Sequence, residues 1–154
     1  MKTADGIVVF TLDGLRFALD LWSVVRVDRS VEVTPLPKAP DIVFGLINVR
    51  GAIIPVVNVR KRFRLPERDI TLTDQLIIAN TRLRTMALVV DQVINILPAS
   101  ASTVVHADEV LPGMEYVKGI VKLADGIVLI HDLEKFLSIP EAEALEVSMR
   151  LLET

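Results

Sequence analysis

The sequence predicts a mostly β protein made of two small five-stranded antiparallel β-barrels packed together, with a short helix after each repeat and a C-terminal helix. Two observations lead to this fold class. Short runs rich in Val and Ile recur along the 154 residues, and turn residues separate them. One of these hairpins, with the short helix that follows it, also occurs twice. Because a sheet of five short strands leaves exposed edges, we expect each one to curl into a barrel or half-barrel.

The repeat relates residues 45–63 to residues 119–137, which align without a gap at an offset of about 74 residues. Gly45 meets Gly119, and Asn58 and Asp132 both stand where a side chain can cap a helix. Any two hairpins rich in Val and Ile look somewhat alike, and this remains the alternative. The matched glycines and caps favour a true duplication.

The elements follow from local pattern. Tight turns are expected at Asp13-Gly14 and Arg50-Gly51. Short helices are expected after Asn58 and at 133–137, and an amphipathic helix at 141–154. The expected strands lie at 6–12, 15–19, 24–27, 31–34, 44–49, 52–57, 75–80, 85–90, 93–97, 103–106, 116–123 and 126–131.

The division of the chain follows from the repeat. We expect one domain, 1–154, containing subdomains at about 14–70 and 71–140, followed by the C-terminal helix. The strand at 6–12 is a candidate to complete the second barrel.

The composition of the chain excludes several classes of function. The net charge is −3 and cysteine is absent, which argues against nucleic-acid binding and against disulfide or thiolate chemistry. We find no signal-peptide pattern and no apolar run near the ~18 residues of a membrane span, so a cytoplasmic protein without membrane insertion is expected. The apolar share of 51% is high. A dense β core and an apolar surface left for partners both remain explanations.

Catalytic patterns are not found in the sequence. His106 and His131 have no further ligands at metal-site spacing, and no serine occurs in a nucleophile-elbow pattern. The basic run 60–64 is read as a solvated helix face or as the rim of a protein interface. We therefore expect no enzyme activity, no cofactor and no metal. The predicted function is protein recognition, in a groove between the barrels suited to a partner helix. The alternative is a small-molecule-binding or enzymatic double-barrel domain that uses the same groove.

The segment Gly45-Leu-Ile-Asn-Val-Arg-Gly51, followed by Ile54-Pro55-Val56, resembles the signature of the CheW family of bacterial chemotaxis coupling proteins. The resemblance extends over nearly the whole chain, through Phe17-Ala-Leu, Met86-Ala-Leu-Val-Val-Asp91 and Tyr116-Val-Lys-Gly119. It implies a fold of two five-stranded barrels. It also implies a non-catalytic scaffold that joins the cytoplasmic tips of chemoreceptors (methyl-accepting chemotaxis proteins) to the regulatory domain of the histidine kinase CheA.

By position, the resemblance also implies a set of receptor-binding residues. For the valines among them, plain core packing is at least as good an interpretation. Asn48 and Arg50 are stronger candidates, because a hairpin tip does not need them for packing. The set is Val24, Val27, Val33, Gly45, Asn48, Arg50, Val93 and Ile96.

One position departs from the family pattern, which usually has an acidic residue where Arg26 stands. In related proteins that residue could pair with the arginine at the position of Arg50. Here two cations would face each other unless Asp28 or Glu32 intervenes. We therefore expect Arg26 to tune the choice of partner, in a divergent pathway or with an altered receptor set.

Overall fold

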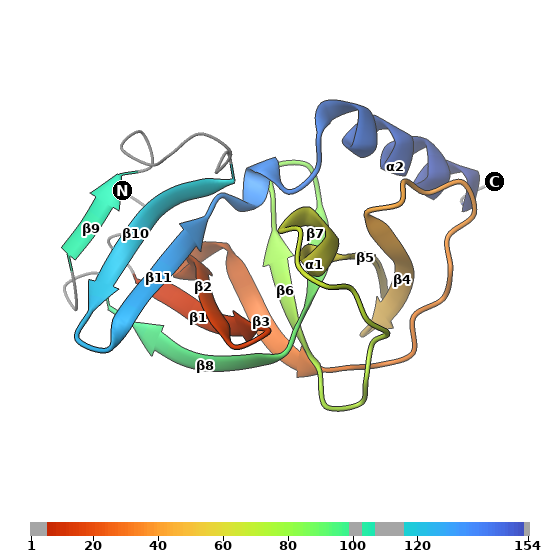
Figure 1. The fold of residues 1–154 in the computed structure, drawn as a ribbon. Coiled ribbons are helices and arrows are strands. Elements are labelled where there is room, and N and C mark those ends of the chain that lie inside the picture. The colour runs from red at the N-terminus through yellow and green to blue at the C-terminus, as the bar shows by residue number, and fades with distance from the viewer. Residues whose placement is uncertain (1–5, 99–102, 107–115, 153–154) are drawn as a thin grey trace.

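The computed structural model describes residues 6–98, 103–106 and 116–152 of the chain. Two curved sheets stand side by side, and the C-terminal helix lies along the top of one of them in the view of Figure 1. Each repeat begins with a hairpin. In the first repeat it is β1 (Ile7–Leu12) with β2 (Leu15–Asp20), and in the second it is β6 (Gln75–Asn80) with β7 (Thr85–Val90). The other elements are η2 (Leu21–Ser23), β3 (Val24–Arg29), β4 (Val43–Val49), β5 (Ala52–Val57), α1 (Val59–Arg62), β8 (Gln92–Leu97), β9 (Thr103–His106), β10 (Val117–Leu123), β11 (Gly126–His131), η5 (Leu133–Lys135) and α2 (Ile139–Leu152).

The sheets correct the expectation of antiparallel barrels. The six-stranded sheet has the order β8-β1-β2-β11-β10-β9 and the five-stranded sheet the order β3-β6-β7-β5-β4. Each contains one parallel pair, β11 with β2 and β5 with β7, so both sheets are mixed. A single bridge from Thr34 to Leu46 links the segment after β3 to β4. The sheets are therefore curled but not closed into barrels.

The two repeats exchange their first hairpins, which explains why the sheets do not follow the expected division near residue 70. In the first repeat, β1 and β2 join the six-stranded sheet, while β3, β4 and β5 form the other one. In the second repeat, β6 and β7 join the five-stranded sheet, while β8, β10 and β11 remain in the six-stranded one. Each sheet is thus built from both repeats.

Register confirms that the two halves are equivalent. Val56 of β5 pairs with Ala87 of β7, and Ile130 of β11 pairs with Ala18 of β2. Val56 and Ile130 are the residues that the sequence repeat aligns. The caps correspond as well, because Asn58 accepts a hydrogen bond from the Lys61 N–H and Asp132 accepts one from the Glu134 N–H. The predicted capping roles of both residues are confirmed.

The exchanged hairpins are buried on both faces, which accounts for much of the apolar share. Phe10 of β1 and Leu88 of β7 belong to one cluster that contains residues of both sheets. Their neighbours Val9 and Ala87 face separate cores, one within each curled sheet. Strands covered on both sides read as continuous apolar runs rather than as alternation.

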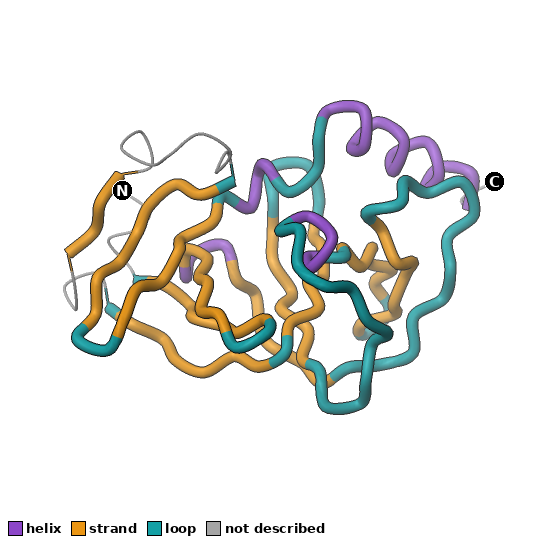
Figure 2. Tube along the Cα trace, viewed as in Figure 1, coloured by secondary structure: helices purple, strands orange, loops and turns teal. Residues whose placement is uncertain are grey.

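Helix α2 packs on the five-stranded half of the molecule. Leu145 is buried in the shared core, and the Ser148 hydroxyl donates a hydrogen bond to the Lys38 carbonyl. Figure 2 shows the long loop from 30 to 42 passing beneath this helix. None of the helices in the described part of the chain is long and apolar enough to cross a membrane.

Candidate partner-binding site

Strands β3 and β8 are the edge strands of their sheets, and both turn apolar side chains outward. On β3, Val25 is 50% and Val27 is 37% exposed, and on β8, Ile94 is 43% and Ile96 is 58% exposed. Successive outward side chains of a strand are two residues apart, so each pair shares one face. We call these four residues the β3–β8 surface. Exposed β-branched side chains on unpaired strand edges are suited to contact with another protein.

The two edge strands are connected indirectly near both ends, through their neighbours β6 and β1. Near the end of β3, Arg29 pairs with Gln75, whose side chain accepts a hydrogen bond of 2.6 Å from the backbone N–H of Val93 in β8. Near the beginning of β3, Leu21 donates a backbone hydrogen bond to Gly6, immediately before the residue that pairs with Leu97 of β8. The strands therefore flank the junction of the two sheets.

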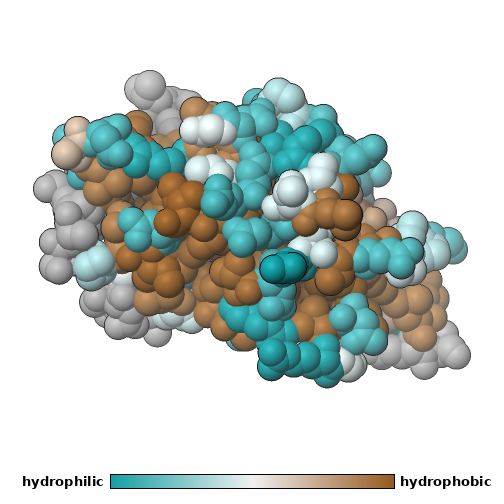
Figure 3. Space-filling model, turned by 90° about the horizontal axis from the view of Figure 1, so that it is seen from below, coloured by the Kyte–Doolittle hydropathy of each residue, from teal (hydrophilic) through white to brown (hydrophobic). Residues whose placement is uncertain are grey.

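Figure 3 views the molecule from below Figure 1, the side toward which β8 and the loop before β6 lie. Apolar surface gathers across the middle of this face, between polar patches. The face thus combines an apolar centre with a polar margin, which is the usual pattern of a protein–protein interface.

Four of the eight expected site residues lie on β3 and β8. Val27 and Ile96 are exposed. Val24 and Val93 are half-buried against the shared core, so they support this surface from below. Sequence reasoning missed Val25 and Ile94, although strand alternation placed them beside Val27 and Ile96.

The other four expected residues lie on β4, at its turn or in the segment before it. Val33 packs against the core of the five-stranded sheet. A Cβ on Gly45 would lie 2.2 Å from the Thr34 carbonyl oxygen, so Gly45 is required by a close backbone approach. The Asn48 Oδ1 accepts a hydrogen bond of 2.9 Å from the Gly51 N–H. Asn48 thus closes the turn, so the expectation that the hairpin tip does not need this residue is wrong. Arg50 is exposed at the turn and has a φ of 53°.

Arg26 is paired with an acidic residue of its own strand. Its Nε donates to Asp28 Oδ2 at 2.7 Å, so Asp28 intervenes in the way the sequence allowed. Both side chains are partly exposed, and such a pair contributes little to stability. The pair with Asp28 neutralises the charge of Arg26 beside the apolar side chains of β3.

The histidines differ in how far the structure describes them. His131 is buried and stacks on Phe63 with ring centroids 4.0 Å apart, near Phe17 and Phe136. Burial lowers the pKa of His131 to about 4, although a hydrogen bond with the Leu129 carbonyl opposes the shift. His131 is therefore packed and neutral near pH 7, while the side chain of His106 lies outside the described residues. Within the described residues, no group of three or more His, Asp or Glu side chains could hold a metal ion.

A network of ion pairs joins the two sheets at α1. Arg60 contacts Asp13 in the β1–β2 turn at 2.5 Å and Asp91 between β7 and β8 at 2.8 Å. Arg68 binds the same Asp91 and also Asp74, each at 2.7 Å. Burial alone would lower the pKa of Arg60, but its hydrogen bonds to Asp91 and Asp13 raise it above the ordinary value. The basic run 60–64 is therefore not simply a solvated face, because Arg60 links the sheets.

The comparisons with known proteins identify the class of protein. The family model described as the CheW-like domain matches residues 6–141. The chain belongs to this family, and it is a scaffold or adaptor protein of bacterial chemotaxis signalling. A small-molecule-binding or enzymatic role for the double sheet is not favoured by this membership.

Individual relatives agree with the family match. The chain is 28% identical over 145 residues to "Chemotaxis protein CheW" of Treponema pallidum, covering 90% of this chain and 85% of that protein. It is 29% identical over 136 residues to the protein of the same name from Klebsiella aerogenes, covering 87% and 82%. Among solved structures, the scaffolding protein TtCheW from Thermoanaerobacter tengcongensis superposes with a TM-score of 0.80 at 29% identity, covering 90% of this chain and 95% of that one.

Proposed function

We propose that this chain couples chemoreceptors to the histidine kinase CheA, and that it does so in the cytoplasm. The observation that carries the proposal is the β3–β8 surface in a chain of the CheW-like family. Four outward β-branched side chains, on the two edge strands that flank the junction of the sheets, provide apolar surface of the kind that an amphipathic helix binds. In this proposal the cytoplasmic tip of a receptor docks there.

The kinase regulatory domain would then bind a different surface of the same chain, since a coupling protein must hold both partners at once. The sequence placed Arg50 in the receptor-binding set, and we propose it instead as a candidate kinase contact, because it is exposed at the β4–β5 turn, away from the β3–β8 surface, and the described residues give its side chain no ion pair. Arg26 would tune the receptor side through its pair with Asp28 on β3.

The receptor surface is tested by titrating a receptor cytoplasmic fragment from the same genome into the chain. Ile96→Glu should weaken binding at least about tenfold, because it places a charge in an apolar contact. Ile127→Glu is the matched control, since Ile127 is 56% exposed on β11 and lies outside the β3–β8 surface. Equal effects of the two variants would contradict the assignment. If Arg26→Glu leaves the same titration unchanged or stronger, Arg26 does not tune this partner.

A further inference from the structure

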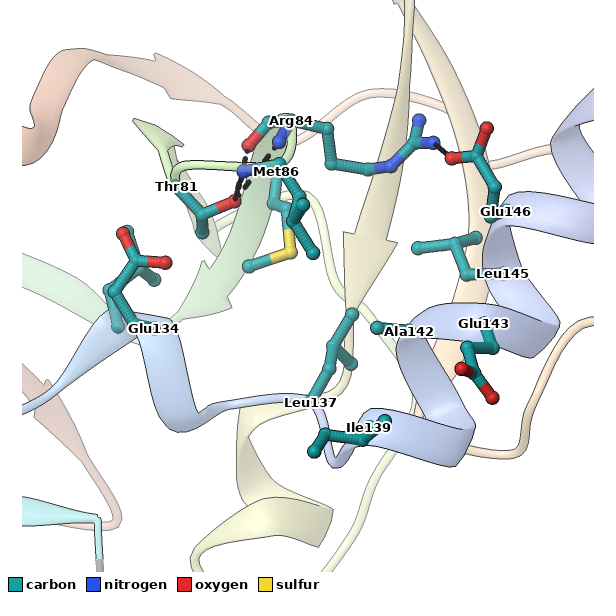
Figure 4. A pocket seen from close by; sticks show the side chains of 12 residues that line it. Thr81, Arg84, Met86, Glu134, Leu137, Ile139, Ala142, Glu143, Leu145 and Glu146 are labelled. Carbon is teal, nitrogen blue, oxygen red and sulfur yellow. Dashed lines mark hydrogen bonds and ion pairs between the residues drawn. The ribbon is translucent and has the colours of Figure 1, made fainter.

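An apolar pocket of about 400 Å³ lies between the β6–β7 turn, η5 and the first turns of α2. Figure 4 shows Met86 and Leu137 facing it, with Ile139 and Ala142 at the beginning of α2. The size is within the range of about 300–1,000 Å³ usual for ligand sites. At its mouth, Leu83 is 79% and Ile139 is 76% exposed. Neither the β3–β8 surface nor the Arg60 network contributes a residue to this pocket.

The equivalent place in the other half of the molecule is filled by aromatic rings. Ala87 and Ala18 occupy equivalent positions, because they pair with the equivalent residues Val56 and Ile130 of the two sheets. The residues immediately before them, Met86 and Phe17, are therefore equivalent as well. The sequence repeat matches Leu137 with Phe63. Phe17 and Phe63 are in contact, with ring centroids 5.0 Å apart. Met86 and Leu137 both line the pocket instead, so the space closed by rings in one half is open in the other.

The rim of the pocket is acidic. Glu143 is exposed and has no ion-pair or hydrogen-bond partner among the residues that the structure describes. The Glu134 carboxylate accepts hydrogen bonds from the Arg82 backbone N–H, but the Arg82 guanidinium is 3.7 Å away and its side chain is 87% exposed, so the ion pair compensates the Glu134 charge only weakly. The cation that lines the pocket, Arg84, is held by Glu146 across one edge (Figure 4). Positive charge on a ligand would therefore be favoured beside the apolar floor.

We propose that this pocket binds a peptide segment of a partner protein that presents an aromatic side chain next to basic residues. The ring would occupy the space that Phe17 and Phe63 fill in the other half, against Met86 and Leu137. The basic residues would lie toward Glu134 and Glu143. This site is independent of the β3–β8 surface and of the receptor role proposed for it.

The test follows the methyl resonance of Met86 by NMR in the full chain labelled with ¹³C-methyl methionine. The probes are the capped tripeptides acetyl-Lys-Phe-Lys-amide, acetyl-Lys-Ala-Lys-amide and acetyl-Glu-Phe-Glu-amide. The first should shift the Met86 signal saturably with a Kd on the order of 1 mM, as expected for one buried ring and two exposed ion pairs. The alanine peptide should give no saturable shift. The glutamate peptide should bind at least about fivefold more weakly.

Two variants locate the binding. Ala142→Phe fills the pocket and should abolish the shift, whereas Val147→Phe on the exposed part of the same helix should leave it unchanged. Glu143→Lys alters only a surface charge and should weaken the lysine peptide at least about threefold. The proposal is overturned if no peptide gives a saturable shift, or if the alanine peptide binds as well as the phenylalanine peptide. Unchanged binding in Glu143→Lys would overturn the assignment of the basic residues.

Discussion

At the scale of single residues, the buried imidazole of His131 is a group whose protonation is strongly altered by the fold. It stacks on Phe63 and contributes no charge to the surface. The sequence favoured a packed or solvated histidine over a metal ligand, and the packed alternative is the one observed. Its burial could not be predicted, because it depends on contact with Phe63 at the end of α1, which belongs to the other repeat.

Stability should therefore depend on pH below neutrality. The pKa of His131 is about 4 in the folded chain and 6.5 in its ordinary state. Below pH 6.5 the unfolded chain takes up a proton that the folded chain refuses, so stability falls as the pH falls toward 4. Between pH 7 and pH 5 this single group should remove about 2 kcal/mol from the free energy of unfolding.

Urea unfolding at pH 7 and pH 5 measures this loss. His131→Phe keeps an aromatic ring against Phe63 and removes the titration, so its stability should change much less over the same interval. An equal loss in both proteins would mean that other groups cause the pH dependence.

At the scale of elements, the β4–β5 hairpin shows how a family signature can reflect folding as well as function. Gly45 lies where β4 passes the backbone of Thr34 and Pro35, and Asn48 closes the turn through Gly51. Both were expected to bind the receptor. Their conformational roles account for them without a partner, and Arg50 is the residue of this hairpin that the fold leaves for other contacts.

Gly45→Ala should therefore destabilise the protein by about 3 kcal/mol or more, because its Cβ would collide with backbone that cannot move cheaply. Gly51→Ala is the matched control. Gly51 also has a positive φ, of 88°, but a Cβ there meets nothing within 4 Å. Its replacement should cost only about 1 kcal/mol of backbone strain. If denaturant melts give the two variants equal stability, the close approach at Gly45 is not the constraint.

The edge strands show the limits of strand alternation in a sequence. The positions of β3 and β8 were predicted closely, but the sequence did not predict which of their side chains turn outward. The pairing of β3 with β6 shifts register between Val24 and Arg26. Such a bulge is set by the neighbouring strand, so alternation in β3 predicts that Val25 and Val27 share a face but not that this face turns outward.

At the scale of the whole molecule, the exchange of hairpins makes the two halves depend on each other. The sequence repeat predicted two similar units, and each observed strand lies near an expected one. The strand expected at 31–34 is wrong, because that segment is a loop with a single bridge from Thr34 to Leu46. The repeat could not predict that β1–β2 and β6–β7 cross to the opposite sheet, because pairing partners are decided by tertiary contacts. Each helix then holds the hairpin of its own repeat: Arg60 binds Asp13, and Glu134 binds Arg82.

These two contacts occupy equivalent positions but should differ in strength. The side chain of Arg60 is 9% exposed, and it contacts both Asp13 and Asp91. Arg60→Ala leaves those carboxylates without this partner and should lower the free energy of unfolding by about 2–3 kcal/mol. Arg82→Ala removes an exposed pair and should change it by less than about 0.5 kcal/mol. Denaturant titration compares the two variants. A similar loss of unfolding free energy in both would contradict the stabilising role of the Arg60 ion pairs.

The central claim is that this chain holds a receptor and the kinase at the same time on separate surfaces. Sedimentation of a receptor cytoplasmic fragment, the CheA regulatory domain and this chain, all from one genome, tests it directly. We predict one complex containing all three. With Ile96→Glu the kinase domain should remain bound while the receptor fragment is lost, and Ile127→Glu should retain both. The claim would be contradicted if the two partners displaced each other, or if Ile96→Glu released the kinase domain together with the receptor.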